Sequence, residues 1–218
     1  MMRDHPERFP WTELSLADPV GPFTGIKLAS LTDETGRCLA LLRSAGLSET
    51  AFTAPAPAER QCRFNDGVVL RPEDRRSIRY SPASLITSCP VAAALSLWER
   101  DVLQAAALRH FGSRVTWIDH AGSFSCRRLY GRSEGRFSEH ATADAIDILG
   151  FRLENGQRIS VLRGWHGEPA DRAFLREVRD GACDLFATVL SPDYNRAHAD
   201  HFHLDQADRG AAGWRLCR

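Results

Sequence analysis

Histidines and an aspartate in the second half of this 218-residue chain have the types and the order needed to bind a metal ion. His140 is followed seven positions later by Asp147, and His201 and His203 form an H-x-H pair further on. Zinc binds neutral imidazole nitrogens and carboxylate oxygens at about 2.0–2.2 Å, and a catalytic zinc site uses three protein ligands and leaves the fourth position to water. We therefore predict that His140, Asp147 and His203 are the ligands of a zinc ion.

The spacing between His140 and Asp147 restricts how this segment can fold. A uniform helix would separate the two residues by about 10 Å, and a uniform strand by about 23 Å. Neither distance suits a single ion, so we expect a turn of small residues after His140 and then a strand over residues 145–149. Residues at i and i+2 of a strand share one face, so His201 and His203 should address the same site.

Histidine has commoner roles in proteins than metal binding. A lone histidine is more often a surface residue or a hydrogen-bonded core residue, and an H-x-H pair arises readily by chance. The metal-site prediction therefore rests on the joint occurrence of the residues, in the order His, Asp and then H-x-H.

Longer motifs around these residues resemble those of known families. The pattern S-x-H-x-x-x-x-A-x-D over residues 138–147, with the distal H-x-H, resembles the zinc D-Ala-D-Ala carboxypeptidases and related murein endopeptidases. Together with GSFSCR at 122–127, PDYN at 192–195 and DHFHLD at 200–205, it resembles more closely the bacterial extensin-like C-terminal family. This resemblance covers about residues 25–210. Ala143 stands where the carboxypeptidases usually have glycine, which changes a turn residue and no ligand.

The resemblance implies a fold and an activity. The fold would be that of the zinc D-Ala-D-Ala carboxypeptidases. The activity would be zinc-dependent cleavage of peptidoglycan stem peptides or cross-links, by a carboxypeptidase or endopeptidase of D,D- or L,D-type. A zinc-bound water would attack the peptide bond, and His201 would take its proton and return it to the leaving amine. The sequence does not select the bond, and two alternatives stay open: a cell-wall binding module with a structural zinc, and a cytosolic dipeptidase.

Further polar residues near the motifs are candidates for supporting roles. The guanidinium of Arg127 presents a fixed fork of donors suited to a substrate carboxylate, although it could equally be a solvated surface group. Glu139 is a second candidate for the catalytic base after His201. Asp200 or Asp205 could orient a histidine ring from behind, or could be a surface charge.

Composition limits the class of protein. The 28 basic residues balance the 28 acidic residues, which argues against a nucleic-acid partner or an anionic membrane surface. A chain of 218 residues with 43% hydrophobic content suits one well-packed domain, and we expect a monomer. We predict a linker or arm at residues 1–30, an N-terminal helical extension packed on the core at 31–84, and a zinc peptidase-like catalytic domain at 85–218.

The cysteines indicate the compartment. Six cysteines are scattered without the C-x-x-C spacing of metal or redox sites, which predicts at least two disulfides, with fifteen pairings to choose from. Disulfides require an oxidising compartment, so we expect a periplasmic or cell-envelope location; six free thiols in a cytosolic protein are the alternative. The opening MMRDHPE has no apolar core and is neither a signal peptide nor a membrane anchor. Because relatives commonly carry an anchor just before this point, we expect a trimmed chain or a late start codon.

The remaining patterns predict an α+β fold. Helices are expected from Thr32 or Asp33 to Gly46, over 90–111 with Gly112 as terminator, and over 169–182. Residues 51–60 should form a loop, and residues 67–70, 115–118 and 186–190 should form strands. Asn155-Gly156 marks a hairpin that begins with the metal-binding strand. Hairpins mixed with a few helices indicate a mainly antiparallel sheet flanked by helices.

Overall fold

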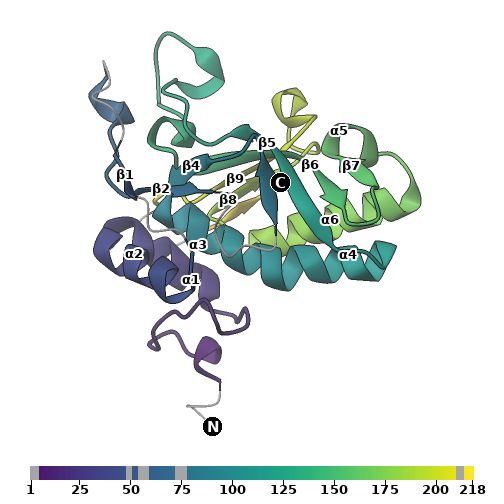
Figure 1. The fold of residues 1–218 in the computed structure, drawn as a ribbon. Coiled ribbons are helices and arrows are strands. Elements are labelled where there is room, and N and C mark those ends of the chain that lie inside the picture. Colours follow the sequence, from purple (N-terminus) through teal and green to yellow (C-terminus); the bar gives the residue numbers. More distant parts are fainter. Residues whose placement is uncertain (1–4, 48–50, 54–58, 72–77, 210–213) are drawn as a thin grey trace.

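The computed structural model describes residues 5–47, 51–53, 59–71, 78–209 and 214–218. These residues form a seven-stranded sheet, a three-stranded sheet and the helices packed against them (Figure 1). No helix within these ranges is both long and apolar enough to cross a membrane.

The seven-stranded sheet has the strand order β10-β8-β9-β6-β5-β3, and β7 pairs with β6. Its pairs are antiparallel apart from β3 with β5 and β8 with β10, which are parallel. The predicted α+β class with a mainly antiparallel sheet is therefore confirmed. The strands are β3 (Arg79–Ser81), β5 (Val115–Gly122), β6 (Ala145–Leu153), β7 (Arg158–Ser160), β8 (Thr188–Leu190), β9 (Phe202–Asp205) and β10 (Leu216–Cys217).

One face of this sheet is covered by long helices (Figure 1). Helix α3 (Cys89–Leu97), a π-helical segment (Trp98–Leu103) and α4 (Gln104–Phe111) follow one another without a break. The side chain of Ser88 accepts a hydrogen bond from the backbone N–H of Val91 at the start, and Gly112 ends α4 with a left-handed φ of 60°. Helix α6 (Pro169–Cys183) packs beside them, and the short α5 (Val161–Gly164) precedes it. Both long predicted helices are thus confirmed.

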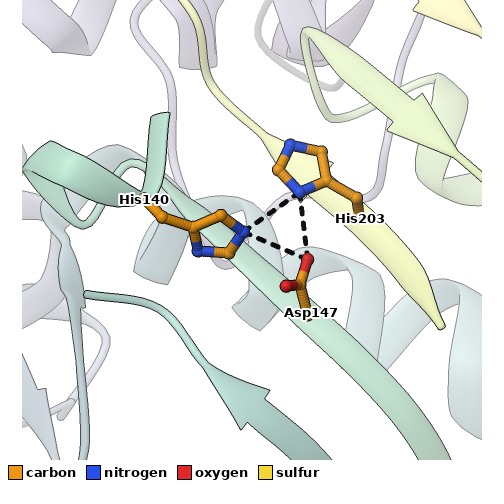
Figure 2. Close-up of side chains that lie close together, drawn as sticks. All are labelled: His140, Asp147 and His203. Atoms are coloured by element: carbon orange, nitrogen blue, oxygen red, sulfur yellow. Dashed lines mark hydrogen bonds and ion pairs between the residues drawn. The ribbon is translucent and has the colours of Figure 1, made fainter. Parts of the chain in front are cut away.

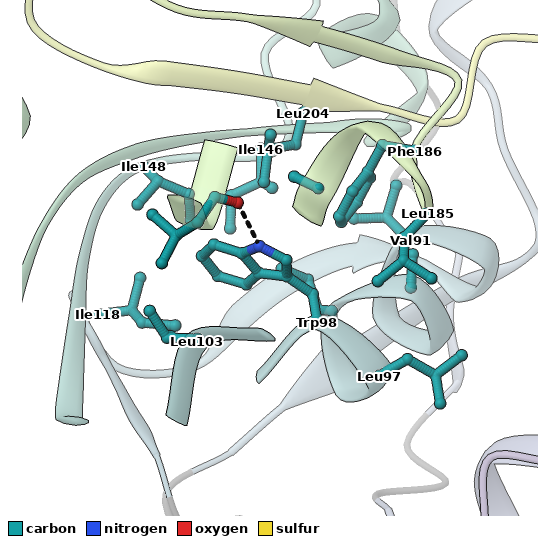
Figure 3. Close-up of a cluster of buried hydrophobic side chains, with 14 of the residues drawn as sticks. Val91, Leu97, Trp98, Leu103, Ile118, Ile146, Ile148, Leu185, Phe186 and Leu204 are labelled. Atoms are coloured by element: carbon teal, nitrogen blue, oxygen red, sulfur yellow. Dashed lines mark hydrogen bonds between the residues drawn. The ribbon is translucent and has the colours of Figure 1, made fainter. Parts of the chain in front are cut away.

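The core lies between these helices and the sheet (Figure 3). Trp98 is fully buried, and its Nε1 donates a 2.9 Å hydrogen bond to the carbonyl of Val178 on α6. Ile146, Ile148 and Leu204 reach the same core from β6 and β9. Trp98 is therefore a packing residue that joins two helices beneath the sheet.

The same strands present polar residues on their other face. Side chains alternate along a strand, so Asp147, between Ile146 and Ile148, points away from the helices. His203, next to Leu204 on β9, does the same. The apolar face of the sheet therefore packs against the helices, and the opposite face carries the polar side chains of Asp147 and His203.

The N-terminal part differs in detail from the prediction. The sequence predicts a linker or arm over residues 1–30 and no helix there, and α1 (Thr24–Ala29) lies within them. Leu28 of α1 is fully buried, and this burial stabilises a helix that is too short to recognise between prolines and glycines. A 3-10 turn (Ser30–Asp33) continues from α1, so α2 (Thr35–Ser44) begins later than predicted.

The small sheet follows α2. It has the order β1-β2-β4 and consists of β1 (Ala51–Phe52), β2 (Gly67–Leu70) and β4 (Leu85–Ser88). Strand β2 has the predicted bounds. Strand β1 takes the first two positions of the predicted loop, whose residues 54–58 lie outside the described part.

Three disulfides pair all six cysteines, which confirms the prediction of at least two. They link α2 to the start of α3, residues near β2 to the segment after β5, and the end of α6 to β10. Two of the three therefore tie residues 31–84 to the rest of the chain. The pairs are Cys38–Cys89, Cys62–Cys126 and Cys183–Cys217.

Candidate metal centre

His140, Asp147 and His203 converge on the polar face of the sheet (Figure 2). His140 Nε2 lies 3.1 Å from Asp147 Oδ1 and 3.2 Å from His203 Nδ1. His203 Nδ1 lies 3.0 Å from the same Asp147 oxygen. One donor atom from each of the three predicted ligands therefore forms a nearly equilateral triangle.

The predicted turn and strand bring His140 and Asp147 together. A 3-10 turn (Glu139–Thr142) follows Ser138, whose side chain accepts a hydrogen bond from the backbone N–H of His140. Ala143 ends this turn in the left-handed conformation, with φ of 59°, and β6 begins two residues later. His203 reaches the site because the antiparallel register of β6 and β9 places it directly opposite Asp147.

The second nitrogen of each ligand histidine is also bonded. His140 Nδ1 donates to the backbone carbonyl of Ser123 at 2.8 Å, so the lone pair of this ring is on Nε2, which faces the cluster. His203 Nε2 lies 3.1 Å from Asp205 Oδ2. Such outer partners hold a metal-ligating imidazole in its tautomer and orientation. The predicted orienting role of Asp205 therefore has the required geometry.

The three residues fit a zinc ion by their donor types and their separation. Ligands of a tetrahedral zinc ion with bonds near 2.05 Å are about 3.3 Å apart, and the donor atoms here are separated by 3.0–3.2 Å. All three residues are buried, with 3–9% of their surface exposed. Two imidazoles and one carboxylate form a donor set typical of catalytic zinc sites.

The charge state of the cluster also suits a cation. Burial raises the pKa of Asp147, but the neighbouring His140 and His203 rings lower it more, so that it lies far below its usual range. Burial lowers the pKa of His203, but the hydrogen bonds to Asp147 and Asp205 raise it more, to about 9. In the metal-free protein, a proton on His203 Nδ1 therefore lies between the donor atoms that would hold the metal.

His201 approaches the same carboxylate from the chain just before β9. Its Nε2 lies 3.6 Å from Asp147 Oδ1, and its Nδ1 lies 2.7 Å from Asp200 Oδ1. His201 and His203 therefore face one site, as predicted. Phe202 points the opposite way, is fully buried and contacts the Trp165 ring edge to face.

The cluster lies in a cleft with a volume of about 370 Å³. Segments around residues 127–140 and 188–209 supply its walls. Asn195 Nδ2 donates a 3.3 Å hydrogen bond to the hydroxyl of Tyr130, which lines the cleft. Arg127 and Glu139 both line the cleft. Arg127 is exposed, and burial and the nearby Asp205 raise the pKa of Glu139. The structure thus places both predicted supporting residues near the cluster.

Some residues of the site carried no clear sequence signal. His198 lines the cleft, and burial together with His201 and His203 lowers its pKa to about 4, so it is neutral near pH 7. Ser88 and Asp144 share a buried 2.6 Å hydrogen bond beneath the turn that carries His140. The Ser88–Asp144 contact joins positions far apart in the chain, and the contact of His140 with Ser123 uses a backbone carbonyl. The spacing of residues in the sequence reveals neither contact.

A buried His/Asp/His group at the bottom of a cleft, on the open face of an α+β domain, defines a candidate metal-binding protein. The chain belongs to the extensin-like protein C-terminus family, which matches residues 36–218. The predicted resemblance to that family is thereby confirmed. No curated protein and no solved structure matches the chain. The relation to the D-Ala-D-Ala carboxypeptidases stays a prediction.

Proposed function

We propose that this protein is a zinc-dependent peptidase that cleaves peptidoglycan stem peptides or their cross-links. The observation that carries the proposal is the triangle of donor atoms from His140, Asp147 and His203, with His201 Nε2 only 3.6 Å from the same carboxylate oxygen. Structural zinc sites use four protein ligands, whereas catalytic sites use three and leave one position open. Within the described part of the chain the group contains three such residues, and it lines an open cleft. This arrangement favours catalysis over a structural role.

His201 has the contacts required of a general base. Its Nδ1 donates to Asp200, so the lone pair is on Nε2, which faces the cluster. A zinc ion held by the three ligands would polarise the scissile carbonyl and acidify a water molecule. His201 Nε2 can then accept the proton of the attacking water and pass it to the leaving amine. Asp200 would stabilise the imidazolium that forms.

The proposed substrate rests on the site and on the family resemblance. Arg127 is exposed at the cleft and can bind a carboxylate of the peptide through its fork of donors. The resemblance of the ligand motifs to the zinc D-Ala-D-Ala carboxypeptidases supports both that fold and a stem-peptide substrate. Three disulfides favour an oxidising compartment, so the periplasm or cell envelope is part of the proposal.

Elemental analysis combined with a digest of purified peptidoglycan tests the proposal. We expect one zinc per chain and new peptide ends. His203→Ala should lose both the metal and cleavage, whereas His201→Ala should keep the metal and lose roughly a hundredfold to ten-thousandfold in turnover. His166→Ala is the matched control, because His166 is exposed and does not line the cleft.

The outcomes separate the rival functions. Zinc without new peptide ends would indicate the cell-wall binding module, and absence of zinc would reject the metal site. A His201→Ala variant that cleaves at the unaltered rate would exclude His201 as the base and leave Glu139 as the next candidate.

A further inference from the structure

Arg209 lies in the wall of the cleft on a segment fixed to the metal centre. It follows β9, four residues after Asp205, which orients His203. The backbone N–H of Ala207 donates to Asp205 Oδ1 at 3.1 Å, and Gln206 Nε2 donates to the carbonyl of Leu185 at 3.0 Å. The start of this segment is therefore held on the same carboxylate that supports a predicted ligand.

The guanidinium of Arg209 is also fixed in place. Its Nη2 donates to the hydroxyl of Thr188, a buried residue of β8. Its central carbon lies 4.3 Å from the ring centroid of Trp214. A guanidinium that stacks on an aromatic ring and bonds to a strand loses little further freedom when it binds a ligand.

Arg209 keeps donors that no described residue uses. Its Nε is buried without a hydrogen-bond partner, and no carboxylate among the described residues forms an ion pair with it. Asp147 and Asp205, which line the same cleft, are engaged by histidines. Glu139 also lines the cleft, and the charge of Arg209 acts to lower the Glu139 pKa, but the two side chains form no ion pair. Among the described residues only Thr188 accepts from the terminal nitrogens of this guanidinium, so they can still donate to an acceptor that a ligand brings into the cleft.

We propose that Arg209 binds a carboxylate of the substrate, at a position separate from Arg127. The inference rests on the proposed peptidase function, since the anion carried by a peptide is a carboxylate and a fixed guanidinium matches its two oxygens. The substrate class is thereby narrowed to peptides with a carboxylate near the scissile bond. That carboxylate is either the C-terminal group or the side-chain group of a diaminopimelate residue.

Binding of four synthetic peptides distinguishes these two sources. The peptides are N-acetyl-X-D-Ala-D-Ala, where X is diaminopimelate or lysine, each with a free or an amidated C-terminus. Lysine and diaminopimelate differ by one carboxylate on the ε-carbon. Calorimetry of the protein as purified gives the affinities, and chromatography of the same samples shows whether cleavage has occurred.

We expect the unaltered protein to prefer one member of a matched pair, and Arg209→Gln to reduce that preference by roughly tenfold to a hundredfold. The matched control is Arg158→Gln, which removes the same charge from an exposed position on β7, away from the cleft. It should leave the preference unchanged. If Arg209 only anchors the C-terminal segment, Arg209→Gln will lower the melting temperature and leave the preference intact, which would overturn the inference.

A second variant covers the case in which Arg209→Gln does not fold. Arg209→Lys keeps the charge and loses the fork, so it should retain only part of the preference; full retention would contradict bidentate binding. A preference that depends on Arg209 without any cleavage would support this inference and reject cleavage at D-Ala-D-Ala; the peptidoglycan digest described above then tests the other bonds. Cleavage combined with a peptide preference that does not depend on Arg209 would support the peptidase and reject this inference.

Discussion

Metal binding at the His140, Asp147 and His203 cluster should release a proton, and its strength should therefore depend on pH. The reason is that hydrogen bonds to Asp147 and Asp205 raise the pKa of His203 to about 9 in the metal-free protein. Zinc needs a neutral imidazole, so the proton and the metal compete for His203. Asp147, with its pKa far below the usual range, is ionised throughout and adds nothing to this dependence.

The magnitude follows from the position of this pKa. At pH 7, a group with a pKa of about 9 is about 99% protonated, which weakens the apparent affinity by about a hundredfold relative to the neutral ring. Each unit of pH between about 7 and 8.5 should strengthen binding by about tenfold, and the gain should level off above about 9. The affinity for zinc should therefore increase as the pH rises.

Two measurements check this expectation. Competition with a chelator of known affinity gives the apparent Kd at each pH, and calorimetry at pH 7 in two buffers of different ionisation enthalpy should count about one released proton. In Asp205→Asn, His203 loses a carboxylate partner, so fewer protons should be released and zinc should bind roughly tenfold to a hundredfold more weakly. Constant affinity from pH 7 to 8.5, with no proton released by the unaltered protein, would refute the reasoning.

Three further predictions concern stability. Replacing both Cys62 and Cys126 by serine removes a link across 64 positions and should lower the free energy of unfolding by about 4 kcal/mol in denaturant titrations; a loss below 1 kcal/mol would contradict the chain-entropy argument. Zinc at a thousandfold excess over its Kd should raise the free energy of unfolding by about 4 kcal/mol, and His140→Ala should abolish that increase. Ala143→Gly should change stability by less than about 1 kcal/mol, because relief of a left-handed alanine offsets the lost methyl group and the flexibility of glycine. Ala145→Gly, which removes a methyl group equally buried in β6 without such relief, should cost about 1.5 kcal/mol, and an equal loss in both variants would show that Ala143 is unstrained.

The parts of the fold that could be predicted are those with a complete local signal. The helical stretch to Phe111 has apolar residues at helical spacing and ends at Gly112, and the hairpin around Gly156 has its turn residues at the tip of two alternating runs. Helix α1 lacks such a signal, because six residues between prolines and glycines are too few to show a helical periodicity. The burial of Leu28 in the folded protein stabilises this helix. Strand β10 has only two residues and pairs in parallel with β8, so only the folded chain identifies it.

The site divides in the same way. The convergence of His140, Asp147 and His203 could be predicted because metal chemistry accepts few residue types and the turn after His140 had to return the chain to Asp147. The contacts that tune the cluster were harder to anticipate. Ser123 contributes its backbone carbonyl, which every residue possesses, so its residue type gives no signal. Arg209 cannot be told from the other arginines by sequence, because only the fold shows that it lines the cleft.

The position of β9 in the large sheet has a consequence for how the protein folds. Strand β9 lies between β8 and β6, and both of these precede it in the sequence. The centre of the sheet is therefore complete only when residues 202–205 have paired with both strands, and His203 meets Asp147 across a separation of 56 positions. Contacts this distant in sequence are costly to close and slow to form. A chain in which β9 is unpaired has only part of the metal-binding group, so tight metal uptake can serve as a kinetic marker for the pairing of β9 with β6.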